Sequence, residues 1–170
     1  MKIKFIVTLF TSIVVCKNVC SQEKLIQLED IWASRTFSPE WVWGINSMND
    51  GVHYSSLNYG DKNVYVTQYS YETGDSVATI VDSKNLEDLS FDAYQFSANE
   101  KKVLLPTETE SIYRHSTRSK FYIYDRATKT TSSLSSDKQR LAQFSPDATK
   151  VAFVRANNIF IKDLNTDIET

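Results

Sequence analysis

An internal repeat with a period of about 50 residues constrains the fold of this 170-residue chain more than any other feature. Segments 45–54, 96–105 and 144–153 each begin with an apolar residue, continue through a turn of small polar residues, and place Val seven positions after the start. An aromatic, strand-like run follows each copy, and two of these runs end in Asp, at Asp125 and Asp163. A unit of this length with several strands is typical of a β-propeller blade.

The residues between the repeats also favour strands. Short runs rich in Tyr, Phe, Val and Ile alternate with Asn, Asp, Ser and Gly, as at 63–69, 76–81 and 121–124. Residues 25–34 form the one stretch whose apolar spacing favours a helix. We therefore predict an all-β fold that comprises the first blades of an incomplete β-propeller. The alternative is a β-sandwich in which similar hairpins recur by coincidence.

The predicted organisation has three parts. Residues 1–21 form a signal peptide, residues 22–40 an N-terminal segment, and residues 41–170 a partial β-propeller. The expected blades lie near residues 41–90, 91–138 and 139–170, the last of them incomplete.

The first 21 residues have the layout of a secretory signal peptide. Lys2 and Lys4 precede an apolar stretch, residues 5–15, which is too short to span a bilayer as a stable helix. Val19 and Ser21 fit the −3 and −1 positions of a cleavage site. We therefore expect an exported protein, periplasmic or secreted, with no membrane span after cleavage. A lipoprotein signal that uses Cys16 or Cys20, or an uncleaved anchor, are the alternatives.

Composition excludes several classes of protein. With 41% hydrophobic and 12% aromatic residues the chain has enough apolar surface to fold, and 4 Gly and 3 Pro exclude a collagen-like sequence. Removal of residues 1–21 takes away both cysteines and leaves 16 basic against 21 acidic residues, a net charge of −5. The mature chain then offers no disulfide, no thiol chemistry, and no excess positive charge for nucleic acid. We expect no cofactor and no metal, because His53 has no companion His or Cys.

The second copy of the repeat is longer than the third. Asp125 lies 29 residues after Phe96, whereas Asp163 lies 19 residues after Phe144. The additional residues include 107–116 and lengthen one hairpin of the predicted blade. Because long excursions from a rigid scaffold often carry function, this hairpin is the candidate site.

The motifs around this hairpin resemble the N-terminal propeller of dipeptidyl peptidase IV, in the prolyl oligopeptidase family of serine peptidases. The similar segments are FS at 96–97, VLL at 103–105, IYRHS at 112–116, FYIYD at 121–125, FSPD at 144–147, KVAFVR at 150–155 and NNIFIK at 157–162. The early IW at 31–32 and FSP at 37–39 also resemble exported bacterial members.

The resemblance implies an eight-bladed propeller joined to an α/β-hydrolase domain that removes dipeptides with Pro or Ala second from a free N-terminus. It implies that Arg114 contacts a carbonyl of the peptide substrate, and the adjacent His115 is a second candidate for substrate binding. It also implies a homodimer for the full-length parent. The independent argument for Arg114 is that a guanidinium stays charged and offers directional donors.

The sequence departs from the family in two ways. It ends at Thr170 and contains no Gly-x-Ser-x-Gly motif, so the catalytic triad and the hydrolase domain are missing, and we expect no catalytic residue here. Glu108 and Glu110 precede the arginine and are separated by one residue, so they do not match the family's amine-binding glutamates. We therefore expect an N-terminal fragment that is inactive on its own.

Other interpretations remain at this stage. Arg114 could be a surface arginine that pairs with Glu108 or Glu110. The whole chain could be an exported, non-enzymatic binding or scaffold protein, or a short surface β-domain in an adhesion or outer-membrane complex. Five polar residues are expected to form or cap turns: Asp50, Asp92, Ser97, Ser145 and Asp147. The tryptophans are expected to pack between elements, with an exposed aromatic patch as the alternative: Trp32, Trp41 and Trp43.

Overall fold

The computed structural model describes residues 25–38, 44–86 and 89–170. Two compact units, Met1–Trp41 and Val42–Thr170, are described separately below. The expected signal peptide lies outside the described residues. Within the part that is described, no helix is long and apolar enough to cross a membrane.

The first unit contains a helix of one turn, α2 (Leu28–Trp32), which is shorter than the sequence pattern indicated. Its start is capped because the backbone N–H of Gln27 donates to the Asp30 carboxylate at 3.0 Å. Trp32 is 80% exposed and does not pack against another element of this unit, contrary to the expectation. Trp41 and Trp43 lie outside the described residues.

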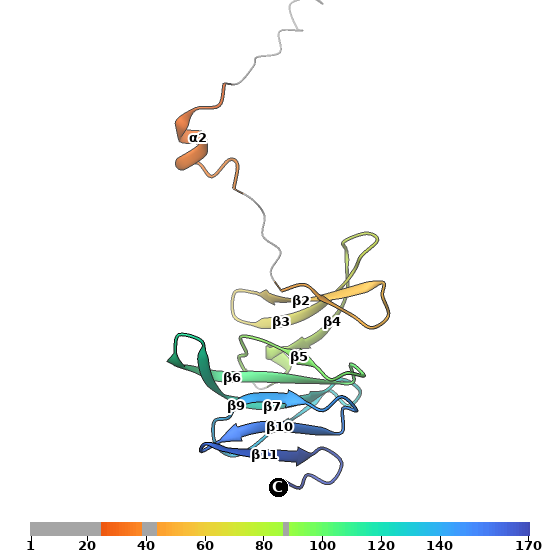
Figure 1. Ribbon diagram of the computed structural model, residues 1–170. Coiled ribbons are helices and arrows are strands. Elements are labelled where there is room, and N and C mark those ends of the chain that lie inside the picture. Colours follow the sequence, from red (N-terminus) through yellow and green to blue (C-terminus); the bar gives the residue numbers. More distant parts are fainter. Residues whose placement is uncertain (1–24, 39–43, 87–88) are drawn as a thin grey trace, which may run out of the picture. The chain divides into compact units, whose positions relative to one another are not determined.

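The second unit contains three antiparallel sheets in which each strand pairs with its neighbour in sequence (Figure 1). The first sheet comprises β1 (Asn46–Ser47), β2 (His53–Tyr59), β3 (Val64–Ser70) and β4 (Ser76–Asp82), followed by the 3-10 helix η1 (Ser83–Asn85). The second comprises β5 (Gln95–Phe96), β6 (Lys102–Tyr113), β7 (Ser116–Asp125) and β8 (Thr130–Ser133). The third comprises β9 (Arg140–Phe144), β10 (Lys150–Arg155) and β11 (Asn158–Asp163).

This architecture confirms the all-β prediction. Strand-by-strand meanders of this kind are the blades of a β-propeller. The third sheet continues beyond β11, because Ile161 and Thr170 exchange two backbone hydrogen bonds of 2.8 and 3.0 Å.

The repeat seen in the sequence recurs in the hydrogen bonds of its turns. In the second sheet the hydroxyl of Ser97 accepts a hydrogen bond from the Lys102 backbone N–H at 3.0 Å. In the third sheet Ser145 accepts the same bond from Lys150 at 2.9 Å. The Ser145 hydroxyl also donates to the Asp147 carboxylate at 2.6 Å. Ser97, Ser145 and Asp147 are therefore turn residues, as predicted.

An ion pair also recurs in the second and third sheets. Lys102 binds Asp125 at 2.8 Å, and Lys150 binds Asp163 at the same distance. Each aspartate ends its strand and also accepts backbone N–H groups of the following turn. The two aspartates at the ends of the repeated strands therefore each have two roles. Each binds the lysine of the partner strand, and each caps the turn that follows.

The first copy of the repeat has a different ion pair at this position. The alignment of the first copy from sequence is wrong by two residues: the Met48 N–H donates to the His53 carbonyl as the Ser97 N–H does to Lys102, so His53 occupies the lysine position. The strand partner of His53 is Ser70 in place of aspartate. His53 Nδ1 instead lies 2.7 Å from the Asp50 carboxylate, which also accepts the backbone N–H groups of Val52 and His53. Asp50 is thus a turn residue, as expected, and His53, the first residue of β2, is bound to it.

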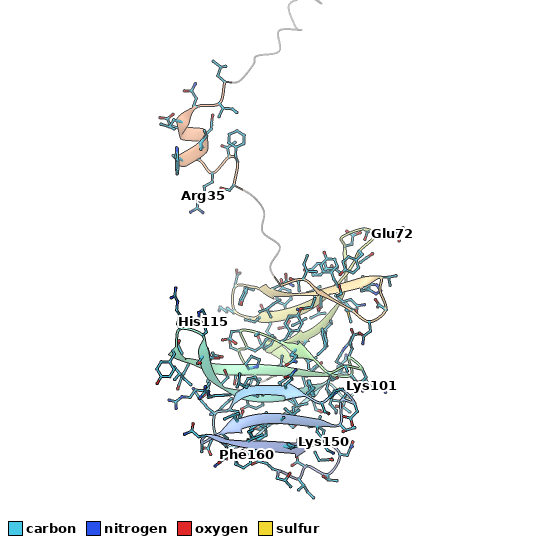
Figure 2. The ribbon with its side chains drawn as sticks, viewed as in Figure 1. Arg35, Glu72, Lys101, His115, Lys150 and Phe160 are labelled. Atoms are coloured by element: carbon cyan, nitrogen blue, oxygen red, sulfur yellow. The ribbon has the colours of Figure 1, made fainter. Side chains whose placement is uncertain are left out.

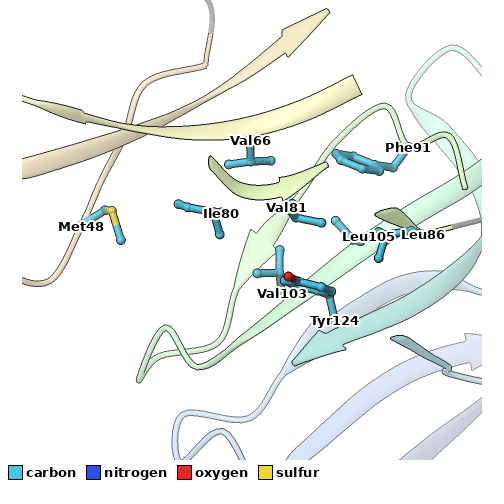
Figure 3. Packing of buried hydrophobic residues seen from close by; sticks show 9 residues of the cluster. All are labelled: Met48, Val66, Ile80, Val81, Leu86, Phe91, Val103, Leu105 and Tyr124. Carbon is cyan, nitrogen blue, oxygen red and sulfur yellow. The ribbon is translucent and has the colours of Figure 1, made fainter. Parts of the chain in front are cut away.

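The second sheet is buried on both of its faces. Val103 and Leu105 point into one hydrophobic cluster, which also holds Val66 and Val81 of the first sheet (Figure 3). Leu104, between them in sequence, points the other way, into a cluster shared with the third sheet. Alternate residues of one strand therefore fill two different cores, which explains why the sequence lacks a clean apolar–polar alternation.

Leu105→Ala should lower the free energy of unfolding by about 2–5 kcal/mol, because the side chain is fully buried between two sheets. Ile159→Ala is the control: Ile159 is 77% exposed, and its change should stay within about 0.5 kcal/mol. Urea unfolding of both variants measures this difference. Equal losses would show that the core does not lie between the first two sheets.

Stability should also fall in acid because of Asp125. Hydrogen bonds from Lys102 and from the N–H groups of Thr128 and Ala127 lower the pKa of Asp125 to about 2. An unfolded Asp titrates near 3.9, so between roughly pH 4 and 2 the unfolded chain binds more protons, and stability declines as the pH falls. Asp125→Asn should reduce this decline in urea midpoints measured at pH 7 and pH 3.

The control for this experiment is Asp61→Asn, since the carboxylate of Asp61 accepts no hydrogen bond from a described residue. The stability of Asp61→Asn should decline between pH 7 and pH 3 as much as that of the parent chain. An unchanged decline in Asp125→Asn would contradict the role given to the Lys102–Asp125 pair.

Candidate functional site

The β6–β7 hairpin runs further than its counterpart in the third sheet. Thr107 pairs with Lys120 in the second sheet, and the equivalent pair in the third sheet is Arg155 and Asn158. In the third sheet a two-residue turn directly follows Arg155, and both residues of this turn have positive φ. In the second sheet the chain continues through residues 108–119 before it returns. We call these residues the hairpin extension.

The extension is irregular where it begins and again near its tip. The pairing shifts register between Thr107 and Glu110 and once more between Ser111 and Tyr113. Glu108, inside the first shift, has φ of 48°. Such bulges bend a strand and redirect its side chains, and they occur often beside functional sites. The extension reaches beyond the ends of the neighbouring strands (Figure 1).

The tip of the extension presents both candidate residues to solvent. Tyr113 pairs with Ser116, which leaves Arg114 and His115 as a two-residue turn. Both are exposed, and neither makes a hydrogen bond or ion pair with any other residue that the structure describes. Figure 2 shows His115 at this end of the second sheet and Lys101 at the other. The Arg114 guanidinium is therefore free to bind another molecule.

The glutamates beside Arg114 are occupied by other cations. Glu108 binds Lys120 at 2.9 Å, and Glu110 binds Arg118 at 2.7 Å. Glu110 also binds Lys138 at 2.7 Å. Hydrogen bonds from Lys138 and then Arg118 lower the pKa of Glu110 below its usual value. The surface pairing of Arg114 with Glu108 or Glu110 is therefore absent from the structure.

The base of the extension is held by the connection between β8 and β9. Ser119 and Gln139 exchange two backbone hydrogen bonds of 2.9 and 2.8 Å. The Gln139 side chain is fully buried, and its oxygen accepts the Phe121 backbone N–H at 3.0 Å. The hydroxyls of Thr109 and Ser119 lie 2.9 Å apart and join the two strands across the first bulge.

Lys138 and Gln139 were not identified from the sequence. They lie outside the repeated segments and outside the hairpin, and they touch it only because the chain folds back after β8. No residue pattern marks such a long-range contact. Among the residues that the structure describes, no group of three His, Cys, Asp or Glu side chains is arranged to hold a metal ion.

Comparison with known proteins agrees with this architecture. Residues 97–170 match the family model described as "Dipeptidyl peptidase IV (DPP IV) N-terminal region". The chain is similar to Porphyromonas gingivalis dipeptidyl peptidase 4, whose crystal structure superposes with a TM-score of 0.69 and 36% identity. That match covers 87% of this chain and 22% of the other. TolB from Acinetobacter baumannii, at 16% identity and a TM-score of 0.50 over 76% of this chain, shares the fold.

Curated relatives point to the same group of proteins. A probable dipeptidyl-aminopeptidase B from Tuber melanosporum (strain Mel28) is 31% identical over 81% of this chain. Human prolyl endopeptidase FAP is 28% identical over 82% of it. The chain spans only 16% and 18% of the lengths of these two proteins. The sheets thus define part of a propeller, and the chain resembles the N-terminal region of dipeptidyl peptidase IV, as its motifs indicated.

Proposed function

We propose that this chain is the N-terminal propeller portion of an exported, dipeptidyl peptidase IV-like serine exopeptidase. In this proposal residues 41–170 form the first blades, and a hydrolase domain outside this chain carries the Ser-His-Asp triad. The parent enzyme removes Xaa-Pro or Xaa-Ala dipeptides from peptides with a free N-terminus, in the periplasm or outside the cell. The relatives support this assignment, since their names describe dipeptidyl peptidases and aminopeptidases.

One observation supports the proposal for this chain: at the tip of the hairpin extension, Arg114 makes no hydrogen bond or ion pair with another residue that the structure describes. Arginine presents N–H donors in a rigid fork and stays charged at any working pH. A peptide carbonyl can therefore be bound without first breaking an intramolecular ion pair. The adjacent His115 is also exposed, and a nitrogen of its ring can donate or accept a further hydrogen bond with the same peptide.

The role of this chain in the reaction is to position the substrate. A peptide held by a directional contact loses its translational and rotational freedom before the chemical step, and the hydrolase domain then acts on an aligned bond. Arg114 takes no part in proton transfer, so it does not contribute to acid–base chemistry. The contact orients the peptide and restricts which end of it enters.

The purified 170-residue chain should release no product from a Gly-Pro or Ala-Pro chromogenic amide, because it contains no Gly-x-Ser-x-Gly nucleophile motif. Absorbance over hours at high protein concentration measures this. Measurable cleavage would contradict the proposal. Reading the gene beyond codon 170 is the complementary test: further blades and a Gly-x-Ser-x-Gly motif support the peptidase, and an immediate stop followed by an unrelated gene favours a scaffold protein.

In the longer gene product, Arg114→Ala should lower kcat/KM for dipeptide amides by about 10- to 100-fold, since a charge-assisted hydrogen bond contributes roughly 1.5–3 kcal/mol. The loss should appear mainly as a higher KM. Lys101→Ala is the matched control, because it removes an exposed cation from the opposite end of the same sheet. Unchanged kinetics in Arg114→Ala would remove Arg114 from the substrate site.

A further inference from the structure

Lys138 connects the hairpin extension to a different part of the chain. It lies in the connection between β8 and β9, and its side chain is only 20% exposed. Its ammonium group binds the Glu110 carboxylate at 2.7 Å and donates to the backbone carbonyl of Glu108. Lys138 therefore binds both a side chain and a backbone carbonyl of the hairpin extension, at the first bulge.

The contacts of Lys138 form the middle of a ladder of alternating charges. In order, the ladder runs Lys120, Glu108, Lys138, Glu110 and Arg118. The other four groups belong to the β6–β7 hairpin itself, so their ion pairs move with it. Of these five groups, Lys138 is the one that belongs to the β8–β9 connection. A half-buried lysine with three partners is screened less by solvent than an exposed pair.

Side-chain contacts are needed here because the backbone ladder is interrupted. Between Thr107 and Glu110 the strand pairing shifts register, so regular hydrogen bonds do not fix the direction of the extension at that point. The Ser119–Gln139 pair anchors β7, and Lys138 anchors the bulged β6 on the other side. Together they fix both strands just before the chain reaches the tip.

We propose that Lys138 is a positioning residue for Arg114: by anchoring Glu108 and Glu110, it sets the direction in which the hairpin extension presents the Arg114 guanidinium. This inference rests on the function proposed above. Lys138 itself contacts no substrate. Displacement of a binding group by about 1 Å can cost up to 100-fold in rate, so loss of this anchor should be visible in kinetics.

The test is a double-mutant cycle in the longer gene product. Lys138→Met should raise KM for a Gly-Pro amide by about 3- to 30-fold and leave kcat nearly unchanged. In an Arg114→Ala background, Lys138→Met should cause no further change, because its effect passes through Arg114. Lys138→Arg, which keeps the charge, should restore most of the wild-type KM. Glu110→Gln loosens the same anchor from the hairpin side and should reproduce the KM increase.

Lys150→Met is the matched control, since it breaks the Lys150–Asp163 pair of the third sheet and leaves the hairpin intact. It should leave KM at the wild-type value. A second readout needs no activity: in the 170-residue chain, amide hydrogen exchange in residues 108–119 should accelerate in Lys138→Met, while residues 102–107 keep their protection.

The outcomes separate this inference from the proposed function. If Arg114→Ala leaves KM unchanged, the proposed function fails. If Arg114→Ala raises KM but Lys138→Met does not, this inference fails. It also fails if the KM increases of the two single variants multiply in the double variant, because Lys138 then does not act through Arg114. Unchanged exchange in residues 108–119 of Lys138→Met also overturns it, whatever the kinetics of Arg114→Ala.

Discussion

Burial of the second sheet on both faces is the constraint on which the rest of this structure depends. Leu105 on one side and Leu104 on the other are almost wholly inaccessible, so β6 is fixed between two neighbouring sheets. A strand held in this way cannot tilt or slide without opening a cavity in one core or the other. The hairpin that continues from β6 therefore leaves the molecule from a rigid base.

In the function proposed above, the hairpin extension uses this rigid base to hold Arg114 in position. Ten residues beyond Leu104 stands Arg114, which the cores alone could not hold in one position. The β8–β9 connection supplies the missing support, since Gln139 is buried against β7 and Lys138 binds the bulged β6. Glu110 is bound by Lys138 and Arg118, and the Arg114 guanidinium has no ion pair among the described residues.

Local interactions could be predicted from the sequence, and long-range ones could not. The turns around Ser145 and Asp147 close through hydrogen bonds between residues two to five apart, so residue type and spacing were sufficient. The length of the hairpin followed from comparing two copies of the repeat. Arg114 was named as a candidate from a motif that resembles a known family, and its role stays a prediction. Lys138 and Gln139 depend on how the chain returns after β8, which no local pattern encodes. The helix was predicted too long because apolar spacing does not mark where a helix ends.

The most direct test of the central claim is a crystal structure of the longer gene product with a bound peptide that carries a free N-terminus and a prolyl residue in second position. We predict a guanidinium nitrogen of Arg114 within about 3.2 Å of a backbone carbonyl oxygen of that peptide. The ammonium group of Lys138 should still bind the Glu110 carboxylate. A bound peptide with the Arg114 guanidinium more than about 5 Å from every peptide oxygen would contradict the account.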